Sequence, residues 1–266
     1  MLTEVKNNIK FLLVSLKYNV KSSLEYKASF IIQTIFMFIN NGFCLIFWAL
    51  VFDVNNGDVK GLEMRDILFV WSIAPASWGI SNFLFGGLRQ INHYVLTGSL
   101  DTYLLQPKNI ILSIATSKCD FAAFGDFLYG AVVGWIACGD LTMYLKFWIY
   151  VIFGTIVTCA VFILIRILVI WLGEVEQIAH IYENSLFITF CTYPYEIFGG
   201  FTKALMFTLV PAAYVSHLPI KLMSSFDIKS FLILISATII ISIFAVVVFY
   251  SSLKKYESGN NIAMKE

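Results

Sequence analysis

The sequence contains little charge for its length. Lys, Arg, Asp and Glu together make up 13% of its 266 residues, about half of their usual share in a soluble domain. Hydrophobic residue types make up 59%, and the mean hydropathy is +0.81. Because so few charges cannot cover a surface that faces water, the composition excludes a soluble enzyme and a protein that binds nucleic acid.

The sequence also lacks the motifs of catalysis and of metal or nucleotide binding. Its five cysteines, an odd number, include no CxxC pair, so they indicate neither a disulfide framework nor a zinc site. The three histidines are far apart, and no GxSxG, HExxH or GxxxxGK[ST] motif occurs. We therefore expect a chain that is not itself an enzyme and that holds no cofactor of its own.

What the sequence does contain is a series of long apolar runs. A membrane-spanning helix needs about 20 apolar residues, so 266 residues have room for about six spans with short loops. We therefore predict an all-α polytopic membrane protein with a single transmembrane domain over residues 1–266. The six predicted membrane-spanning helices cover residues 28–52, 67–85, 120–138, 147–172, 178–193 and 231–250.

The lysines and arginines predict how this chain is oriented. Residues 1–27 contain five lysines, and the residues after Tyr250 contain three. Cytoplasmic segments next to membrane spans carry an excess of Lys and Arg, so we place both termini in the cytoplasm and the chain in the cell membrane. An even number of crossings is then required, which favours six spans over seven.

Two further segments complete the predicted topology. In residues 1–27, apolar residues recur at helical spacing and the lysines lie largely off that stripe, as in a helix that lies in the membrane interface. Residues 194–219 contain a turn and then an apolar run, 201–217, that Pro211 interrupts and Pro219 ends. We expect this segment to form an outer re-entrant element between spans 5 and 6, buried in protein or lining water.

The stretch at residues 86–109, between spans 2 and 3, is the most informative aqueous loop. Its apolar residues are spaced as on one face of a short helix, which Gly98 would end as a C-cap before Pro107 redirects the chain. Such a helix suits insertion into a groove of a cytoplasmic partner; a connector that only closes the bundle is the alternative. The residues expected at this coupling site are Leu88, Ile91, His93, Tyr94, Val95, Gly98, Asp101 and Pro107.

Polar residues inside the predicted spans are costly in lipid and tend to face protein or water. Asn40 and Asn41 lie near the middle of span 1, where they either line a translocation path or hydrogen-bond a neighbouring helix. Asp126, Arg166 and Glu183 each lie within a few residues of the cytoplasmic end of a span, at a depth of roughly 9 Å. This shared depth predicts an ion pair or triad that holds spans 3 to 5 together; a proton or substrate relay is the alternative.

Three short motifs resemble those of one transporter class. Residues 98–107 read G-S-L-D-T-Y-L-L-Q-P and resemble the G-x-L-D-x-x-L-L-x-P stretch of permease subunits in bacterial type-2 ATP-binding-cassette exporters. Residues 193–198 read Y-P-Y-E-I-F and are similar to their outer Y-P-x-x-I-F element. Residues 253–258 read L-K-K-Y-E-S and are similar to their L-(R/K)-(R/K)-Y-E-S tail. A mild departure is that Gln106 and Lys108 flank the proline where an arginine is more usual.

This resemblance implies a membrane subunit that pairs with a second permease, identical or paralogous, and with two cytoplasmic ATPases. Those ATPases would bind ATP and Mg, and their closure would move the 86–109 loop and switch the access of a central cavity. The lipid bilayer is the remaining partner. The residues alone leave two other interpretations open: a proton-coupled secondary carrier that uses Asp126, Arg166 and Glu183, and a membrane scaffold without transport activity.

Overall fold

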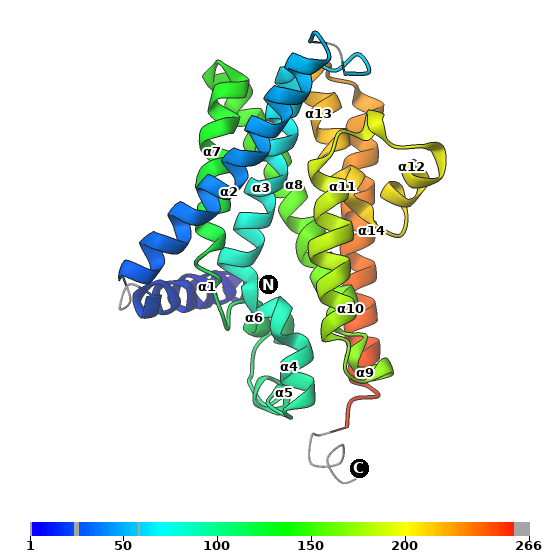
Figure 1. Ribbon diagram of the computed structural model, residues 1–266. Helices are drawn as coiled ribbons and strands as arrows, with labels where there is room; N and C mark the ends of the chain where they lie inside the picture. The colour runs from blue at the N-terminus through cyan, green and yellow to red at the C-terminus, as the bar shows by residue number, and fades with distance from the viewer. Residues whose placement is uncertain (1, 24–26, 58, 258–266) are drawn as a thin grey trace.

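The computed structural model describes residues 2–23, 27–57 and 59–257, and these residues form a helical bundle (Figure 1). Within these ranges there is no β-strand, and the prediction of an all-α chain is confirmed for them. The helices that run along the bundle are α2 (Lys27–Val54), α3 (Met64–Phe85), α7 (Ala123–Cys138), α8 (Leu141–Arg166), α10 (Glu176–Ile181) continued by η3 (Tyr182–Phe187) and α11 (Ile188–Thr192), and α14 (Ile228–Leu253).

Successive long helices run in opposite directions. In Figure 1, α2 rises, α3 descends, and the alternation continues through α7, α8, the α10–α11 segment and α14. The end of the bundle at which α4 and α5 lie is called the loop end, and the opposite end is called the far end. The last turn of α14 reaches the loop end (Figure 1).

Shorter helices gather near the two ends of the bundle. Those toward the loop end are α1 (Leu2–Ser23), η2 (Gly86–Gln90), α4 (Ile91–Leu96), α5 (Leu100–Leu104), α6 (Ile110–Ala115) and α9 (Val169–Leu172). Those toward the far end are η4 (Tyr195–Ile197), α12 (Gly200–Phe207), η5 (Pro211–Tyr214) and α13 (His217–Ser224). The last four cover the segment for which an outer re-entrant element was predicted.

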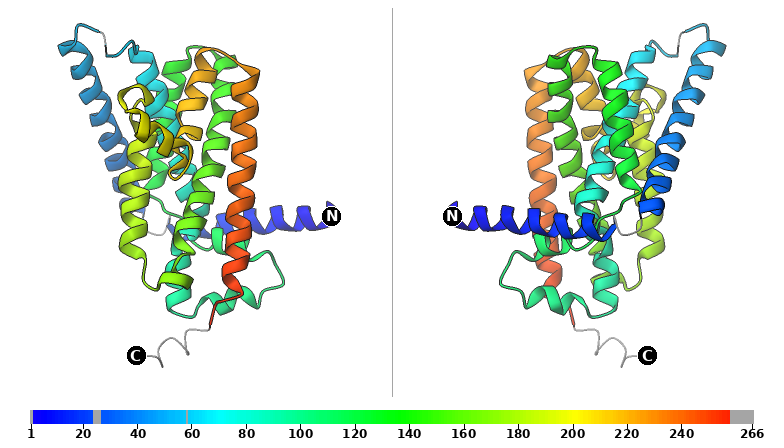
Figure 2. Two further views of the ribbon diagram at one scale, coloured as in Figure 1. Left: turned by 90° about the vertical axis from the view of Figure 1, so that its right-hand side faces the viewer. Right: turned by 90° about the vertical axis from the view of Figure 1, so that its left-hand side faces the viewer.

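Helix α1 lies across the bundle instead of along it (Figure 2). The side chain of Asn19 ties it to α6 by donating from Nδ2 to the carbonyl oxygen of Thr116, at 2.9 Å. This crosswise placement is the one expected of an interfacial helix. Met1 and residues 24–26 of the predicted 1–27 segment lie outside the described residues, as do residues 258–266 of the basic tail.

Among the described residues, four helical stretches are long and apolar enough to cross a membrane: Lys27–Val54, Met64–Leu96, Leu141–Leu172 and Ile228–Leu253. Helices α12 and Pro211–Ser224 pass that criterion together, but they bend by 65°, so the number becomes five only if the pair forms one span. Helix α7 has 16 residues, and the π-helical turn η3 interrupts α10–α11. The described residues thus form a multi-pass membrane protein with four to five membrane-capable helices by length and composition, against the six predicted.

Local sequence signals set several helix ends. Asp140 precedes α8, and its side chain accepts a hydrogen bond from the backbone N–H of Met143 at 2.8 Å. Asp227 caps α14 in the same manner, accepting from two backbone N–H groups of the first turn. Helix α7 ends at Gly139, whose φ of +76° is in the left-handed region that favours glycine. The long apolar runs therefore become helices with ends close to those predicted.

Helix α3 is at the centre of the bundle. In its apolar stretch 72% of the residues are buried, against 17% in each of the stretches of α2 and α14. A Cβ atom at Gly79 would lie 2.4 Å from the backbone nitrogen of Phe127, and one at Gly130 would lie 2.6 Å from the carbonyl oxygen of Ser72. Glycine at both positions therefore allows α3 and α7 to pack with their backbones in close contact. The outward faces of α2 and α14 are left for lipid or another membrane protein.

Candidate functional site

A buried ion pair joins α8 to the segment that follows it. Arg166, the last residue of α8, donates from Nε to Oε1 of Glu183 and from Nη2 to Oε2, both at 2.7 Å. The side chains of Arg166 and Glu183 are 2% and 0% exposed. A two-pronged contact of this kind matches the planar guanidinium to the carboxylate and is among the stronger hydrogen-bonded arrangements in proteins. The sequence-based expectation that these two residues share a depth is met by direct contact.

Two further charged residues extend this pair into a cluster. Arg89 of η2 donates from Nε to Glu183 Oε2 at 3.1 Å, and Arg166 Nη1 donates to Glu176 Oε2 at 2.6 Å. Two asparagines complete the contacts: Arg89 Nη1 donates to Asn82 Oδ1 at 3.1 Å, and Asn92 Nδ2 donates to Glu176 Oε2 at 3.0 Å. The four charged side chains and two asparagines are called the charge cluster below.

The charge cluster is balanced, and each of its charged groups is paired. It contains two arginines and two glutamates, and each charged group has at least one opposite charge within 3.1 Å. The guanidinium of Arg89 also lies over the rings of Trp78 and Phe162, at 5.5 and 5.7 Å from their centroids. Burying charges is expensive unless they are paired and hydrogen-bonded, and here they are both. The cluster therefore fixes η2 and α4 of the 86–109 loop against α3, α8 and α10.

Sequence analysis missed four of the polar partners in this cluster: Asn82, Arg89, Asn92 and Glu176. Asn82 and Arg89 are seven residues apart, which is two helical turns, so one face of a continuing helix would carry both. Glu176 lies between the predicted spans 4 and 5, two residues before the start of span 5. The polar face that ends an otherwise apolar span was the signal available for the first two residues.

Asp126 does not join Arg166 and Glu183, so the predicted triad is wrong for this residue. It lies in the first turn of α7 and accepts a hydrogen bond from Asn41 Nδ2 of α2 at 2.5 Å. Among the described residues, no basic side chain forms an ion pair with it. Equal depth was the only ground for the triad, and depth does not determine which face of a helix a side chain occupies. Asp126 therefore belongs to a different site from Arg166 and Glu183.

That second site is a cavity of about 280 Å³ near the middle of the bundle, called the mid-bundle cavity below. Both asparagines proposed for a translocation path, Asn40 and Asn41, line it, and so does Asp126. Asn41 is buried, whereas Asn40 is exposed on the outer face of α2. The complete lining is Met37, Asn40, Asn41, Cys44, Trp71, Ala74, Pro75, Trp78, Asp126, Thr158, Phe187, Ile188, Cys191, Thr192 and Val215.

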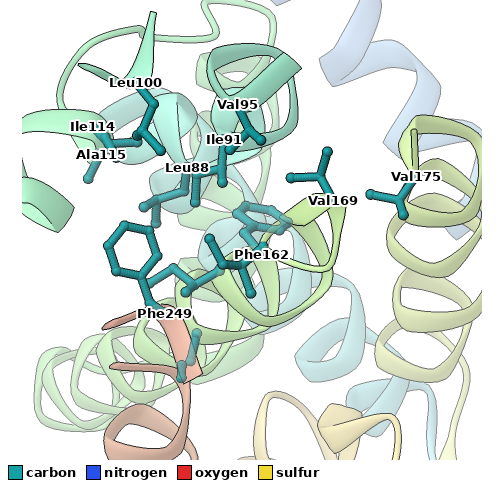
Figure 3. Packing of buried hydrophobic residues seen from close by; sticks show 14 residues of the cluster. Leu88, Ile91, Val95, Leu100, Ile114, Ala115, Phe162, Val169, Val175 and Phe249 are labelled. Carbon is teal, nitrogen blue, oxygen red and sulfur yellow. The ribbon is translucent and has the colours of Figure 1, made fainter. Parts of the chain in front are cut away.

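The apolar residues of the 86–109 loop occupy a different environment from the one predicted. Leu88, Ile91 and Val95 are 3%, 0% and 2% exposed and belong to a hydrophobic cluster that includes Phe162 and Phe249 (Figure 3). The expected docking face is thus buried in the chain's own core. An amphipathic pattern predicts that a face is covered but does not identify what covers it, and here the bundle does so.

The exposed residues of this loop lie on its other side. His93, Leu104, Leu105 and Pro107 are exposed, with Leu105 at 86%. Tyr94 is half-buried, and its hydroxyl lies 2.8 Å from Ser117 Oγ.

The turn after α4 also matches the sequence in part. Gly98 has a φ of +71° just after the end of α4, which confirms the predicted left-handed turn. Asp101 lies three residues after Gly98, in the first turn of α5, and is half-buried. The glycine therefore separates the two short helices of the loop and sets the direction of the second.

Comparison with known families identifies the class of this protein. The family described as ABC-2 family transporter protein matches residues 38–260, which is most of the chain. The chain therefore belongs to the ABC-2 transporter family, whose permeases associate with ATPase subunits of the ATP-binding-cassette class. Searches among curated proteins and among solved structures found no match.

Proposed function

We propose that this chain is the membrane-spanning permease subunit of an ATP-driven exporter and works with a second permease and two cytoplasmic ATPases. The observation that carries the proposal is the charge cluster, because it joins two parts with different tasks. On one side are η2 and α4 of the 86–109 loop; on the other is the helix of Glu183, which continues into α11 and lines the mid-bundle cavity. Membership in the ABC-2 transporter family supports the same function.

In this proposal the chain crosses the cell membrane six times with both termini in the cytoplasm. The alternating directions of α2, α3, α7, α8, α10–α11 and α14 support that count (Figure 1). Although α7 is short, it packs along α3 through Gly79 and Gly130 and so lies at the same depth as its neighbour. The 65° bend between α12 and Pro211–Ser224 supports a re-entrant element at the far end.

The ATPases bind ATP and Mg and dock on the exposed side of the 86–109 loop. The docking surface that we propose contains His93, Leu104, Leu105 and Pro107, with Tyr94 and Asp101 behind it. This assignment replaces the buried face of Ile91 and Val95. Exposed leucines in the same loop as an exposed histidine and proline offer an apolar anchor with a polar rim, as in other helix-in-groove contacts.

The second permease covers the outer face of α2. Asn40 is exposed there, surrounded by large apolar residues such as Phe36 and Phe43, which are 69% and 65% exposed. An amide that faced lipid at the middle of a span would lack hydrogen-bond partners, so protein or water is expected on this face. Because Asn40 also lines the mid-bundle cavity, the same face provides a connection between the cavity and the partner permease.

Movement of the loop is transmitted through buried, directional contacts. When the ATPases close, η2 and α4 move with them, and Arg89 pulls on Glu183 because their atoms are in direct contact. Glu183 lies in the π-helical turn η3, and such turns often occur where a helix must change shape for function. The displacement then reaches α11, which forms one wall of the mid-bundle cavity, and changes the access to it.

The contacts of Asp126 do not favour a proton-coupled carrier. It required Asp126, Arg166 and Glu183 to act together, but Asp126 bonds to Asn41 while the other two form their own pair. Nothing in the described contacts connects the carboxylate of Asp126 to the charge cluster. A scaffold without transport activity is separated from the exporter by measuring ATP-dependent efflux from vesicles.

Crosslinking tests where the ATPases dock. In a background without the five native cysteines, a cysteine at Leu105 or His93 should form a short-range crosslink to a cytoplasmic ATPase. A cysteine at Lys146, near the start of α8 at the far end, is the matched control and should form none. Crosslinks from Lys146 but not from Leu105 would contradict both the orientation and the docking surface.

A pair of substitutions separates docking from folding. Leu105→Asp places a charge on an exposed position, so the chain should fold normally and lose its ATPase. Ile91→Asp buries a charge in the cluster of Figure 3, so the chain itself should be destabilised. Retention of the ATPase and of ATP-dependent efflux in Leu105→Asp would exclude this docking surface.

A further inference from the structure

The mid-bundle cavity is lined mostly by apolar residues and, among the described residues, by a single carboxylate. Its walls come from α2, α3, α7, α8, η3 and α11, and most of the lining is aliphatic or aromatic. Asp126 is its one carboxylate, and the residues that line it in the described part of the chain include no lysine, arginine or histidine. A volume of about 280 Å³ is near the lower limit of the usual range for ligand pockets, about 300–1,000 Å³. The cavity therefore suits a small molecule.

Asp126 has spare capacity to bind a ligand. Its side chain is 4% exposed, and Oδ1 accepts a hydrogen bond from Asn41, but Oδ2 has no hydrogen-bond partner among the described residues. A buried carboxylate without a counter-charge is unfavourable, since a single hydrogen bond from an amide replaces all of its hydrogen bonds to water. The charge cluster shows that this same chain pairs its other buried carboxylate, Glu183, with two arginines. The missing counter-charge at Asp126 indicates a site for a cation that comes from outside the chain.

The remaining walls favour an organic cation over a metal ion. Trp71 and Trp78 both line the cavity, and indole rings attract cations through their faces. The guanidinium of Arg89 already lies over the ring of Trp78, which leaves Trp71 for a bound cation. Pro75 lies between the two tryptophans on α3 and has no N–H to donate to the carbonyl oxygen of Trp71, so a second acceptor is available there. No group of three or more metal-ligating side chains occurs in the described ranges. Phe187, Ile188 and Val215 provide apolar surface for hydrophobic substituents.

We propose that the mid-bundle cavity binds a small lipophilic cation, with the Asp126 carboxylate as its counter-charge and the indole of Trp71 beside its charged group. As a statement about cargo, this proposal rests on the exporter function proposed above. An anion is disfavoured by the unpaired carboxylate, and a neutral molecule would leave its charge uncompensated. Exposed Asn40 marks the side from which such a molecule enters.

The test compares two probes of the same shape in the full chain purified with its ATPase. Benzyltrimethylammonium carries a permanent positive charge, and neopentylbenzene is its neutral carbon isostere. Equilibrium binding of each radiolabelled probe is measured in detergent. The cation should bind at least about tenfold more tightly than the isostere. Equal binding of the two probes, or no binding of the cation, would overturn the proposal, and this comparison needs no variant.

Matched substitutions then locate the charge that the cation meets. Asp126→Asn keeps the shape of the side chain and its contact with Asn41, and it should weaken binding of the cation by about thirtyfold or more while the neutral probe is unaffected. Asp53→Asn, the same change at an exposed position near the far end of α2, should leave both affinities unchanged. Trp71→Phe keeps an aromatic ring and should weaken cation binding less than Asp126→Asn. An unchanged cation affinity in Asp126→Asn would place the site elsewhere.

The same samples distinguish failure of this proposal from failure of the exporter function. If the ATPase co-purifies with the chain and the cation does not bind, the cavity proposal is wrong and the exporter proposal stands. If the cation binds but no ATPase co-purifies and no ATP-dependent efflux is detected, the cavity is a ligand site of a protein that is not this exporter. Size-exclusion profiles of each variant establish that the folded complex is being compared.

Discussion

The charge cluster and the mid-bundle cavity show two ways in which this chain places carboxylates away from water. Glu183 is 0% exposed and receives two arginines, so its charge is compensated within the chain. Asp126 is 4% exposed and receives one asparagine, with no cation in contact among the described residues. The two residues lie at a similar predicted depth, but their surroundings differ in charge.

This difference separates a structural element from a binding site. A paired carboxylate contributes to folding because removing either partner leaves the other charge buried alone. An unpaired one contributes little to folding, and its charge is available to a ligand. Substitution of Glu183 should therefore change the stability of the fold strongly, and substitution of Asp126 should change it weakly.

Glu183→Ala should destabilise the protein most. The change leaves Arg166 buried without its two-pronged partner, at a cost of about 3–5 kcal/mol, so the thermal midpoint in detergent and the folded yield should both fall sharply. Glu174→Ala changes an exposed glutamate in the connection between α9 and α10; it is the control and should change little. Similar midpoints for the two variants would show that the pair does not stabilise the fold.

The double substitution Arg166→Met with Glu183→Leu should recover part of that loss. Apolar side chains of similar volume avoid the desolvation of two charges, so the double variant should be more stable than the sum of the single changes by about 1–3 kcal/mol. Thermal unfolding of all four members of the cycle measures this coupling. An additive result would mean that the two side chains do not interact energetically.

Arg89→Ala should have an intermediate effect on stability and a larger one on coupling. Its side chain is 21% exposed and makes one ion pair, so we expect a loss of about 1.5–3 kcal/mol, while Arg166 still compensates Glu183. Arg89→Lys keeps the charge but not the planar fork. In both variants the ATPase should still co-purify, whereas the stimulation of ATP hydrolysis by cargo should fall. Unimpaired stimulation would exclude the transmission through Arg89.

Asp126→Asn should have the smallest effect on stability. The amide keeps its neighbour Asn41 and removes an unpaired buried charge, so the free energy of unfolding should change by less than about 1.5 kcal/mol in either direction. Thermal unfolding without ligand provides the measurement. A loss comparable to that of Glu183→Ala would show that Asp126 has a structural counter-charge, and it would remove the contrast between the two regions.

Much of the helix content could be predicted from the sequence. Apolar runs of about the length of a membrane span have few alternatives to helix, because every backbone polar group must be satisfied in lipid. Span 1 was predicted at residues 28–52 and α2 covers Lys27–Val54; span 6 was predicted at 231–250 and α14 covers Ile228–Leu253. Gly98 was also predicted correctly, since a left-handed residue after a short helix is usually glycine.

The candidate sites were predicted only in part, for a geometric reason. Counting residues along each span placed Asp126, Arg166 and Glu183 at one depth, but it did not determine their rotation about the helix axes. Helix packing directs Arg166 and Glu183 toward each other and Asp126 toward Asn41 on α2. Counting residues could not predict the contact of Arg89 with Glu183, because that contact depends on how η2 packs against η3.

The sequence by itself determined the class of protein, the positions of the long apolar helices and the residues that are expensive to bury, because hydrophobic length and charge are local properties. The tertiary structure decided which of those residues meet. It buried Ile91 and Val95 in the chain's own core and left Leu105 exposed, although all three are apolar residues of the same loop. Among the described residues it also gave Glu183 two arginines and Asp126 none, because ion pairing depends on contacts of a few ångströms between helices that are far apart in the sequence.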